Sequence, residues 1–211
     1  MSYLNIALSK GRIGNDSYKL FKKLGLGDSI TPESRKLIFR DEKNKITYIY
    51  VKTSDVVTYV ENGVVDLGIV GKDMILEKDG NVYEIFDLGF GKCKFAIAGL
   101  GGSNSYYQDK ITKVATKYPR ITKKYFAERN QKVETIKLNG SVELAPLIGL
   151  SDVIVDIVET GNTLKANGLK IIEEMFNISA RLICNKISYR FKYDEINNIV
   201  KGLKEVRGNY D

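Results

Sequence analysis

Residues 156–164, with the sequence DIVETGNTL, place an acidic side chain before a short turn that is rich in hydroxyl and amide groups. Gly161 lets the backbone approach an anion closely, and the N–H groups of the turn can point at that anion. The hydroxyl groups of Thr160 and Thr163 can donate as well, and Asp156 can accept hydrogen bonds from ribose hydroxyl groups. The pattern predicts a site for a sugar-borne phosphate, although an ordinary turn between a strand and a helix, capped by Thr163, has the same composition.

The chain contains no histidine, which narrows the chemistry that it can perform. Ser-His and Cys-His nucleophile pairs are excluded, and so are metal sites with imidazole ligands. An enzyme of this composition has to work with charge, with the positioning of its substrates and with a metal ion that a substrate brings. The two cysteines, Cys93 and Cys184, lie in apolar, strand-like stretches, so we expect two buried free thiols rather than a disulfide.

The formal net charge of +7 and the pI of about 9.2 favour polyanionic partners, such as nucleic acid, an anionic membrane or small molecules rich in phosphate. The charge also has a plainer explanation, which is that it keeps the protein in solution. The lysines are spread along the whole chain, and this disfavours a dedicated nucleic-acid-binding surface. No apolar stretch is long enough to span a bilayer and the N-terminal residues lack the pattern of a signal peptide, so we expect a cytoplasmic protein without a membrane partner.

Strand and helix patterns alternate along the chain and predict an α/β fold with largely parallel sheets. In the first half we expect a strand at residues 4–8, a helix that stops at Gly25, a hairpin of residues 35–39 and 46–51, a helix capped by Ser54 and ended by Gly63, and a strand at residues 66–70. In the second half we expect strands at residues 113–116, 133–138 and 152–158, helices at residues 121–129 and from Ser141 to Gly149, and a final helix at residues 193–206.

Two stretches of the sequence correspond to one another. Ser54, Gly63 and Asp66 match Ser141, Gly149 and Asp152 at offsets of 87, 86 and 86 residues. Any two strand–helix units look somewhat alike, so a generic similarity explains this as well as a repeat does. A repeat predicts two related lobes that face a cleft, with ligands beyond the carboxyl ends of the strands. We expect crossings between the lobes near residues 90–92 and 176–179, so that residues 1–90 and 178–211 form lobe I and residues 91–177 form lobe II.

Residues 143–164, with the sequence ELAPLIGLSDVIVDIVETGNTL, are similar to the defining motif of the ATP phosphoribosyltransferase family. Residues 7–12, 64–73, 115–119 and 138–143 match the same family, so that the resemblance covers essentially the whole chain in the right order. The resemblance implies two lobes similar to the type II periplasmic-binding-protein fold, with a cleft between them. It also implies a glycosyltransferase that binds ATP and catalyses the first step of histidine biosynthesis.

In that family, N1 of the adenine of ATP attacks C1 of phosphoribosyl diphosphate, and pyrophosphate leaves together with Mg²⁺. The reaction suits a chain without histidine, because a displacement with an oxocarbenium-like transition state needs no nucleophile from the enzyme. It needs two anionic substrates held in line, and positive charge at the place where the pyrophosphate departs. The resemblance implies that Mg²⁺ is carried with the pyrophosphate, and it assigns no residue of the chain to the metal.

The resemblance also assigns roles to the residues that bind phosphoribosyl diphosphate. The 5-phosphate should be bound by Thr160, Gly161, Asn162 and Thr163, with Asp156 and Glu143 near the ribose. The pyrophosphate and the ATP phosphates should face the catalytic residues Lys10, Arg12 and Arg35. The planar fork of arginine suits this role because it neutralises two phosphate oxygens at once, although a surface ion pair would explain Arg35 equally well.

A second set of matching residues should contact the nucleotide. These residues are Lys10, Gly71, Lys72, Asp73 and Thr116. Asp73 has an alternative role as the cap of the helix that follows it. Lys52 departs from the family pattern, because we expect arginine there in many relatives. Lysine keeps the charge but loses the bidentate geometry, which leaves the role of this position open.

In its length the chain is similar to the short-form members of the family, which work with a separate regulatory subunit similar to histidyl-tRNA synthetase. We therefore expect a homodimer on its own, a hetero-octamer with that subunit, and little inhibition of the isolated chain by histidine. A solute-binding protein of the same architecture is an alternative, but such a protein ordinarily carries an export signal. A nucleic-acid-binding module is a third possibility, and it predicts steeply salt-dependent binding to any duplex.

Overall fold

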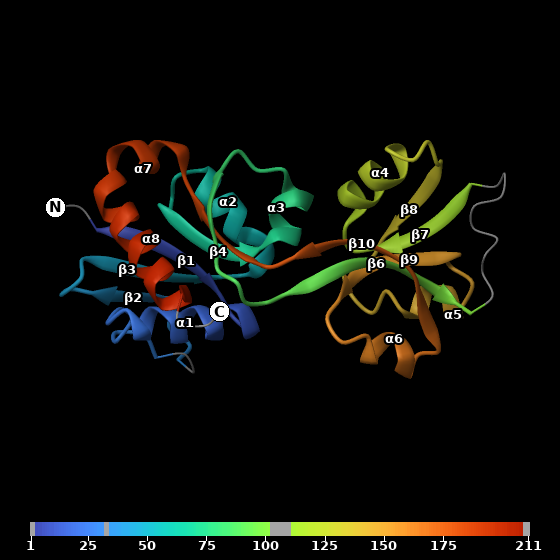
Figure 1. Cartoon of the computed structure of the whole chain (residues 1–211), viewed down its shortest axis with the longest axis horizontal. Coiled ribbons are helices and arrows are strands. Elements are labelled where there is room, and N and C mark those ends of the chain that lie inside the picture. The colour runs from blue at the N-terminus through green and yellow to red at the C-terminus, as the bar shows by residue number, and fades with distance from the viewer. Residues whose placement is uncertain (1–2, 32–33, 102–110, 209–211) are drawn as a thin grey trace. The chain divides into compact units, whose positions relative to one another are not determined.

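The computed structural model describes residues 3–31, 34–101 and 111–208. The chain divides into two compact units. Unit 1 consists of Met1–Gly91 together with Ser179–Asp211, and unit 2 consists of Lys92–Ile178. Each unit contains one sheet with helices packed against it (Figure 1), which confirms the predicted α/β class.

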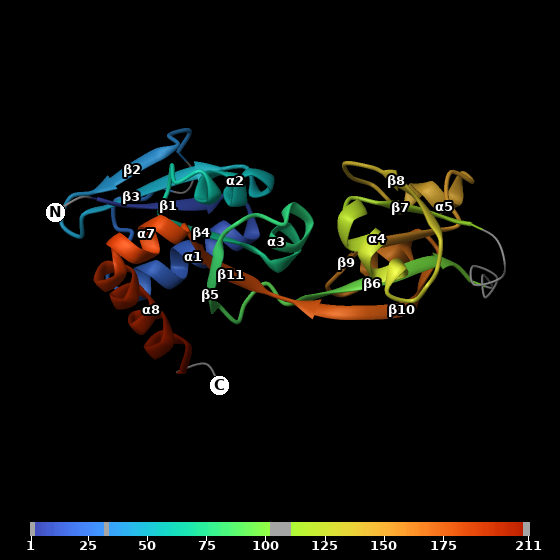
Figure 2. The same ribbon diagram turned by 90° about the horizontal axis from the view of Figure 1, so that it is seen from above.

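Unit 1 is built around a six-stranded sheet with the order β2-β3-β1-β4-β11-β5. Its elements are β1 (Leu4–Ser9), α1 (Arg12–Lys23), β2 (Ile38–Asp41), β3 (Ile46–Val51), the short 3-10 turn η1 (Thr53–Asp55), α2 (Val56–Glu61), β4 (Leu67–Gly71), α3 (Lys72–Lys78), β5 (Tyr83–Asp87), β11 (Ala180–Cys184), α7 (Lys186–Phe191) and α8 (Tyr193–Gly208). Strands β3, β1 and β4 are parallel, whereas β2 is antiparallel to β3 and β11 is antiparallel to β4. The C-terminal part of the chain therefore completes a sheet that the N-terminal part begins (Figures 1 and 2).

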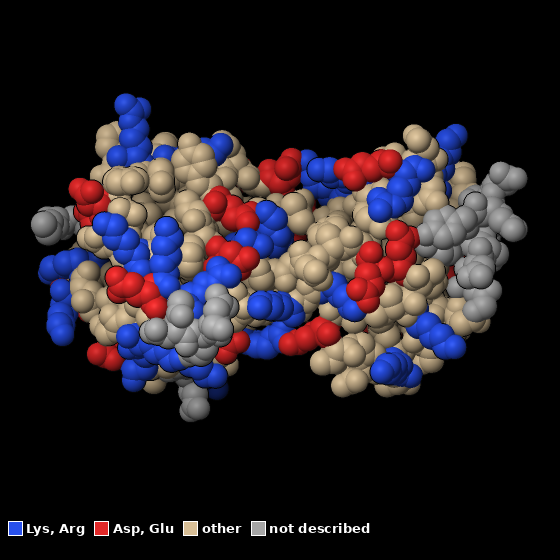
Figure 3. Space-filling model, viewed as in Figure 1, with Lys and Arg blue, Asp and Glu red and all other residues tan. Residues whose placement is uncertain are grey.

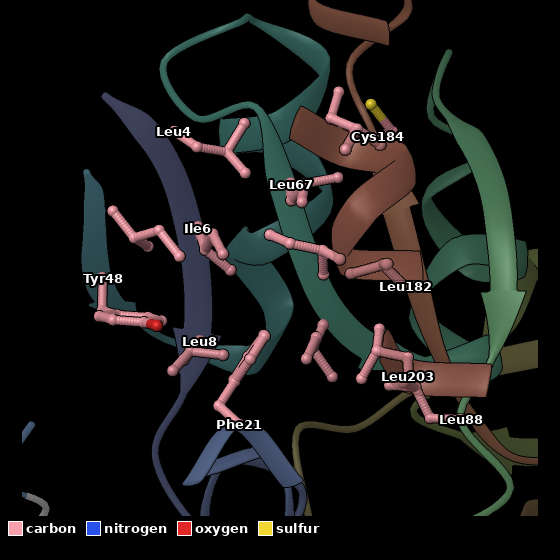
Figure 4. Close-up of a cluster of buried hydrophobic side chains, with 14 of the residues drawn as sticks. Leu4, Ile6, Leu8, Phe21, Tyr48, Leu67, Leu88, Leu182, Cys184 and Leu203 are labelled. Carbon is pink, nitrogen blue, oxygen red and sulfur yellow. The ribbon is translucent and has the colours of Figure 1, made fainter. Parts of the chain in front are cut away.

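The core of unit 1 lies between this sheet and helices α1 and α8. Side chains alternate across a strand, so Leu4, Ile6 and Leu8 of β1 point to one face of the sheet. There they join a buried cluster with Phe21 of α1 and Leu203 of α8 (Figure 4). Each of these side chains stabilises the fold by about 1.5–3 kcal/mol when it is fully buried. The cluster thus fixes β1, and with it the edge at which the parallel strands end.

Unit 2 is built around a five-stranded sheet with the order β10-β6-β9-β7-β8. Its elements are β6 (Cys93–Leu100), β7 (Thr112–Thr116), α4 (Pro119–Ala127), β8 (Val133–Lys137), α5 (Leu144–Leu147), β9 (Val153–Val158), α6 (Asn162–Ala166) and β10 (Leu169–Ile178). Strands β8, β7 and β9 are parallel, and β6 is antiparallel to both β9 and β10.

The two units share one topology. The order β1-α1-β3-α2-β4 corresponds to β7-α4-β8-α5-β9, with the first strand lying between the other two in both sheets. An aspartate precedes the last strand of each set. Asp66 Oδ2 accepts the N–H of Asn5 at 2.8 Å, and Asp152 Oδ2 accepts the N–H of Lys113 at 2.8 Å. In return, each aspartate N–H donates to the carbonyl of the same partner at 2.9 Å. The correspondence in the sequence is therefore a repeated structure.

The predicted N-caps, Ser54 and Ser141, are wrong. Ser54 lies inside η1, where its Oγ donates to Asp55 Oδ1 at 2.9 Å, and Ser141 takes a left-handed φ of 49° before α5 begins. At both places a backbone bond closes the turn before the helix. The N–H of Asp55 donates to the carbonyl of Lys52 at 2.8 Å, and the N–H of Leu144 donates to the carbonyl of Ser141 at 3.2 Å. The turn before each helix is thus closed by a backbone carbonyl group rather than by a serine hydroxyl.

The two thiols differ in burial. Among the described residues neither cysteine forms a disulfide; Cys184 of unit 1 is buried, whereas Cys93 of unit 2 is only half-buried, so the expected burial of both thiols is wrong for Cys93. Across the described ranges, none of the helices combines the length and the apolar character that crossing a bilayer requires.

Candidate functional site

The predicted phosphate loop connects β9 to α6. Gly161 takes the N-cap position of α6 with φ 76° and ψ 5°, which lies in the left-handed region that strains any residue with a Cβ atom. Within the described chain, α6 starts without a side-chain cap, and the N–H of Asn162 reaches Oγ1 of Thr160 at 3.4 Å. Thr163 lies inside the first turn of α6 rather than before it. The alternative interpretation, in which Thr163 caps the helix, is therefore wrong.

Buried apolar side chains hold this loop on both sides. Val158 precedes it and Leu164 follows it, and both side chains are 5% exposed within one core cluster. The polar residues between them, Thr160, Asn162 and Thr163, are exposed. The first N–H groups of a helix have no partner within the helix and carry its partial positive charge. Buried side chains therefore anchor the loop, while its hydrogen-bond donors stay exposed, and this arrangement suits the binding of a phosphate monoester.

Three further predicted residues of unit 2 have different surroundings. Asp156 is half-buried on β9 and accepts the N–H of the next residue at 2.8 Å. Glu143 takes the N-cap position of α5, but its side chain does not cap that helix. Thr116 is fully buried, donates to the carbonyl of Val155 at 2.7 Å and accepts the N–H of Tyr118 at 2.9 Å. Because its hydroxyl group is engaged on both sides, Thr116 holds the turn after β7 in place.

In unit 1, a lysine follows each of the three parallel strands. Lys10 follows β1, Lys52 follows β3, and Lys72 is the first residue after β4. The carboxyl ends of neighbouring parallel strands lie at the same edge of a sheet, so these three residues meet at one edge. Arg12, the first residue of α1, adds a guanidinium group there. This carboxyl edge is therefore strongly basic.

Arg35 belongs to the same edge. Strand β2 spans Ile38–Asp41 rather than the predicted residues 35–39, and it runs antiparallel to β3. The N–H of Tyr50 donates to the carbonyl of Leu37 at 2.7 Å, so the chain before β2 lies beside the carboxyl end of β3. Arg35 is exposed at this place, close in the fold to the strand end that Lys52 follows. The structure thus brings together all of the predicted basic residues of unit 1.

The segment Gly71-Lys72-Asp73 begins α3. Asp73 is 8% exposed, and a Cβ atom on Gly71 would lie 2.1 Å from its Oδ1 atom, so only glycine allows the carboxylate to fold back over the strand end. Gly71 itself is the N-cap residue, and no side-chain cap is formed at this described helix start. The ammonium group of Lys72 forms an ion pair with Glu84 of β5. Sequence reasoning missed Glu84, because nothing in the local sequence brings β5 near α3.

Charges of both signs are mixed on the face of the molecule seen in Figure 3. There, lysine and arginine side chains are interspersed with aspartate and glutamate side chains on both units. A protein dedicated to nucleic acid would instead carry a basic stripe. Among the residues that the structure describes, no group of three or more acidic or cysteine side chains could hold a metal ion.

Comparison with known proteins identifies the family. The family described as HisG: ATP phosphoribosyltransferase matches residues 52–205. The ATP phosphoribosyltransferase of Clostridioides difficile (strain 630) is 69% identical over 206 residues, which cover 98% of this chain and 99% of that protein. The chain belongs to the ATP phosphoribosyltransferase family. A second family member, from Clostridium kluyveri (strain ATCC 8527), is 52% identical over 202 residues, covering 95% of this chain and 92% of its own length.

Solved structures agree with this family and with the predicted fold. The ATP phosphoribosyltransferase (HisG:HisZ) complex from Thermotoga maritima contains a chain that matches with a TM-score of 0.84 and 35% identity, covering 96% of this chain and 98% of that one. The sulphonate-binding protein SsuA of Escherichia coli matches with a TM-score of 0.61 over 97% of this chain and 72% of its own, but at 15% identity it shows the fold alone. The predicted two-lobed fold of the type II periplasmic-binding kind is confirmed. The activity of ATP phosphoribosyltransferases, which is the first step of histidine biosynthesis, is the activity of this chain.

Proposed function

We propose that the loop from Thr160 to Thr163 binds the 5-phosphate of phosphoribosyl diphosphate. The observation that carries this proposal is the left-handed Gly161, which starts α6 among exposed donors. A phosphate monoester carries close to two negative charges, and helix N–H groups stabilise such a group. Asp156 lies on the strand that leads into the loop, where its carboxylate accepts hydrogen bonds from ribose hydroxyl groups. Glu143 has the same role from the start of α5.

The basic edge of unit 1 binds the more highly charged phosphates. In this proposal Lys10, Arg12 and Arg35 neutralise the pyrophosphate of one substrate and the triphosphate of the other. As N1 of adenine attacks C1 of the ribose, the bond from C1 to the pyrophosphate oxygen breaks and that oxygen gains negative charge. Fixed cations beside it stabilise this charge more in the transition state than in the ground state. The enzyme then needs no proton-transferring side chain at C1.

In this proposal the nucleotide-binding residues of unit 1 include those at the start of α3, and the nucleotide-binding residue of unit 2 is Thr116 at the end of β7. Lys10 and Lys72 supply ammonium groups, and Gly71 supplies a close backbone approach. Asp73 stabilises the carboxyl end of β4, because its carboxylate packs against Gly71. Thr116 acts through the backbone, since its hydroxyl group is already engaged with two backbone partners.

Mg²⁺ enters this proposal as a part of the substrate. The residues present fit an ion held mainly by pyrophosphate oxygens and water, because the edge that faces the phosphates is basic and the described residues offer no cluster of acidic ligands. The metal supplies further neutralisation of the departing pyrophosphate. Lys10, Arg12 and Arg35 orient the same group from the protein side.

We also infer a regulatory partner and a cytoplasmic location. The relative from Thermotoga maritima is found in a HisG:HisZ complex and matches this chain over nearly its whole length. We propose further that the chain forms a homodimer on its own and a hetero-octamer with a regulatory subunit that resembles histidyl-tRNA synthetase. A cytoplasmic location follows from the two substrates, which are intracellular phosphate esters.

An absorbance assay tests the proposal. The pure chain is mixed with ATP, phosphoribosyl diphosphate and Mg²⁺, and the ultraviolet absorbance of the N1-linked adduct is followed, with and without the regulatory subunit. Replacing Arg12 by Gln should lower kcat by about 100-fold, since loss of one fixed donor to a developing charge costs this much in other enzymes. Replacing Arg190, an exposed arginine of α7, should leave the rate unchanged. An unchanged rate for the Arg12→Gln variant would remove the basic edge from the mechanism.

A further inference from the structure

Among the three lysines that end the parallel strands of unit 1, Lys72 has a distinct environment. Its ammonium group forms an ion pair with Glu84, and the two side chains are 28% and 25% exposed. Within the described part of the chain, neither Lys10 nor Lys52 forms an ion pair. Lys72 is therefore the lysine of this edge whose charge is already neutralised before any phosphate arrives.

Glu84 is shared between two cations. Its second oxygen, Oε1, lies 3.3 Å from Nη1 of Arg181 on β11. The Nε atom of Arg181 is buried and has no hydrogen-bond partner in the described structure. A buried donor without a partner carries a free-energy cost and calls for an explanation. Arg181 thus has spare capacity to bind Glu84 if Lys72 releases it.

Asp87 keeps Arg181 in place. Nη1 of Arg181 lies 3.0 Å from Oδ2 of Asp87, while Oδ1 accepts the N–H of Gly89 at 2.9 Å and the hydroxyl of Ser179 at 2.8 Å. Burial alone would raise the pKa of Asp87, but the bonds from Gly89 and Ser179 and the charge of Arg181 outweigh it, so the pKa is lowered. Asp87 remains a carboxylate at neutral pH. It therefore holds the guanidinium group beside Glu84 whether or not Lys72 is present.

We propose that Glu84 is a positioning residue that withholds Lys72 from the nucleotide until a phosphate group displaces it, after which Arg181 binds Glu84 alone. The exchange replaces one ion pair of Lys72 by another and leaves Glu84 paired, so no charge becomes isolated. The ligand is a polyphosphate, because a strongly charged group competes with a carboxylate for an ammonium better than a neutral one does. This inference rests on the proposed role of Lys72 in nucleotide binding.

The test compares Glu84→Gln with a matched control. Glutamine has the shape of glutamate but no charge, so it should release Lys72 and lower the Kd of the chain for ATP by about threefold, in line with the small energies of ion pairs that remain partly exposed to solvent. The control is Glu174→Gln in unit 2, because Glu174 forms a similar ion pair with Lys94. It should leave the Kd for ATP unchanged. Isothermal titration with ATP measures both values, and thermal denaturation shows that both variants fold.

A third and a fourth variant separate this inference from the proposed site. Lys72→Met should raise the Kd for ATP, and adding Glu84→Gln to it should change nothing further. The KM for phosphoribosyl diphosphate should stay constant in Glu84→Gln while the KM for ATP falls. Weaker ATP binding by Glu84→Gln, or an effect of Glu84→Gln that persists without Lys72, would overturn the role of Glu84 as a competitor. An unchanged Kd in Lys72→Met would overturn it as well and would remove Lys72 from the nucleotide site, whereas adduct formation by the parent chain would still stand.

Discussion

Replacing Gly161 by Ala perturbs both the stability of the chain and the proposed binding of phosphate, and the two effects can be measured separately. An alanine forced into the left-handed region costs about 1–2 kcal/mol. The added Cβ atom would meet only Cγ1 of Val158, at 3.8 Å, so crowding adds little to this cost. We expect the midpoint of thermal unfolding to fall by about 2–8 °C, the shift that 1–2 kcal/mol produces in a chain of this size.

The effect on the substrate should be larger than the effect on stability. A relaxed turn points the N–H groups of Asn162 and Thr163 away from the phosphate, and a hydrogen bond to a charged group contributes about 1.5–3 kcal/mol. The loss of one such bond raises the KM for phosphoribosyl diphosphate by about 10- to 140-fold, since each 1.4 kcal/mol is a factor of ten. The KM for ATP should stay the same. Steady-state kinetics with each substrate varied in turn measures both constants.

Gly149 provides the control for this experiment. It follows α5 in the same unit with a φ of 74°, and a Cβ atom there would meet nothing within 4 Å. Gly149→Ala should therefore lose as much stability as Gly161→Ala and keep the KM for phosphoribosyl diphosphate of the parent. Equal KM values for the two variants would refute the assignment of the loop to the 5-phosphate.

Three further predictions concern the scaffold. Lys192→Met should lower the free energy of unfolding in urea by about 1.5–3 kcal/mol, because Lys192 donates to the carboxylate of Asp66 at 2.8 Å and its loss leaves that carboxylate with the hydrogen bonds from Asn5 and Ser188 but without a counter-charge; adding Asp66→Asn should restore part of the loss. Asp87→Asn should be less stable than the parent at neutral pH, and since the folded pKa of Asp87 lies below its ordinary value of 3.8, the difference should shrink as the pH falls past 3.8 and be lost only below the folded pKa in urea titrations. Burial raises the pKa of Cys184 to about 12, so iodoacetamide should label Cys93 in the native protein and Cys184 only after unfolding, as mass spectrometry would show.

Local patterns were sufficient for most of the strands. The apolar alternation of residues 46–51 predicted β3 with its observed bounds, and the β-branched run at residues 152–158 predicted β9 to within one residue. Both strands could be predicted because each is buried on at least one face, and the apolar residues in the sequence mark the buried positions. The tight turn at Gly161 could be predicted from the sequence for a similar reason, whereas phosphate binding there stays a prediction. A glycine between threonines after a strand has few structural uses other than a tight turn with exposed donors.

Features that depend on the tertiary structure could not be predicted from the local sequence. The caps at Ser54 and Ser141 failed because a backbone carbonyl group closes each turn, and no residue type signals this. The ion pair of Lys72 with Glu84 was missed because β5 reaches the sheet through β11, which comes from the far end of the chain. Lys52 was noted as a departure from the family, but its place beside Lys10 became clear only from the order of the strands.

The repeated topology supplies equivalent strand ends for the two kinds of phosphate that we propose the two units bind. In both units an aspartate, Asp66 or Asp152, fixes the start of the last parallel strand in the same way, so the strand ends of the two sheets are equivalent positions. Unit 1 places Lys72 directly after its last parallel strand, whereas unit 2 places the loop with Gly161 after its own. Pyrophosphate and triphosphate carry several charges that only cations neutralise, while a monoester is held well by amide and hydroxyl donors. The different residues at equivalent strand ends therefore match the different charges of the groups that each unit is proposed to bind.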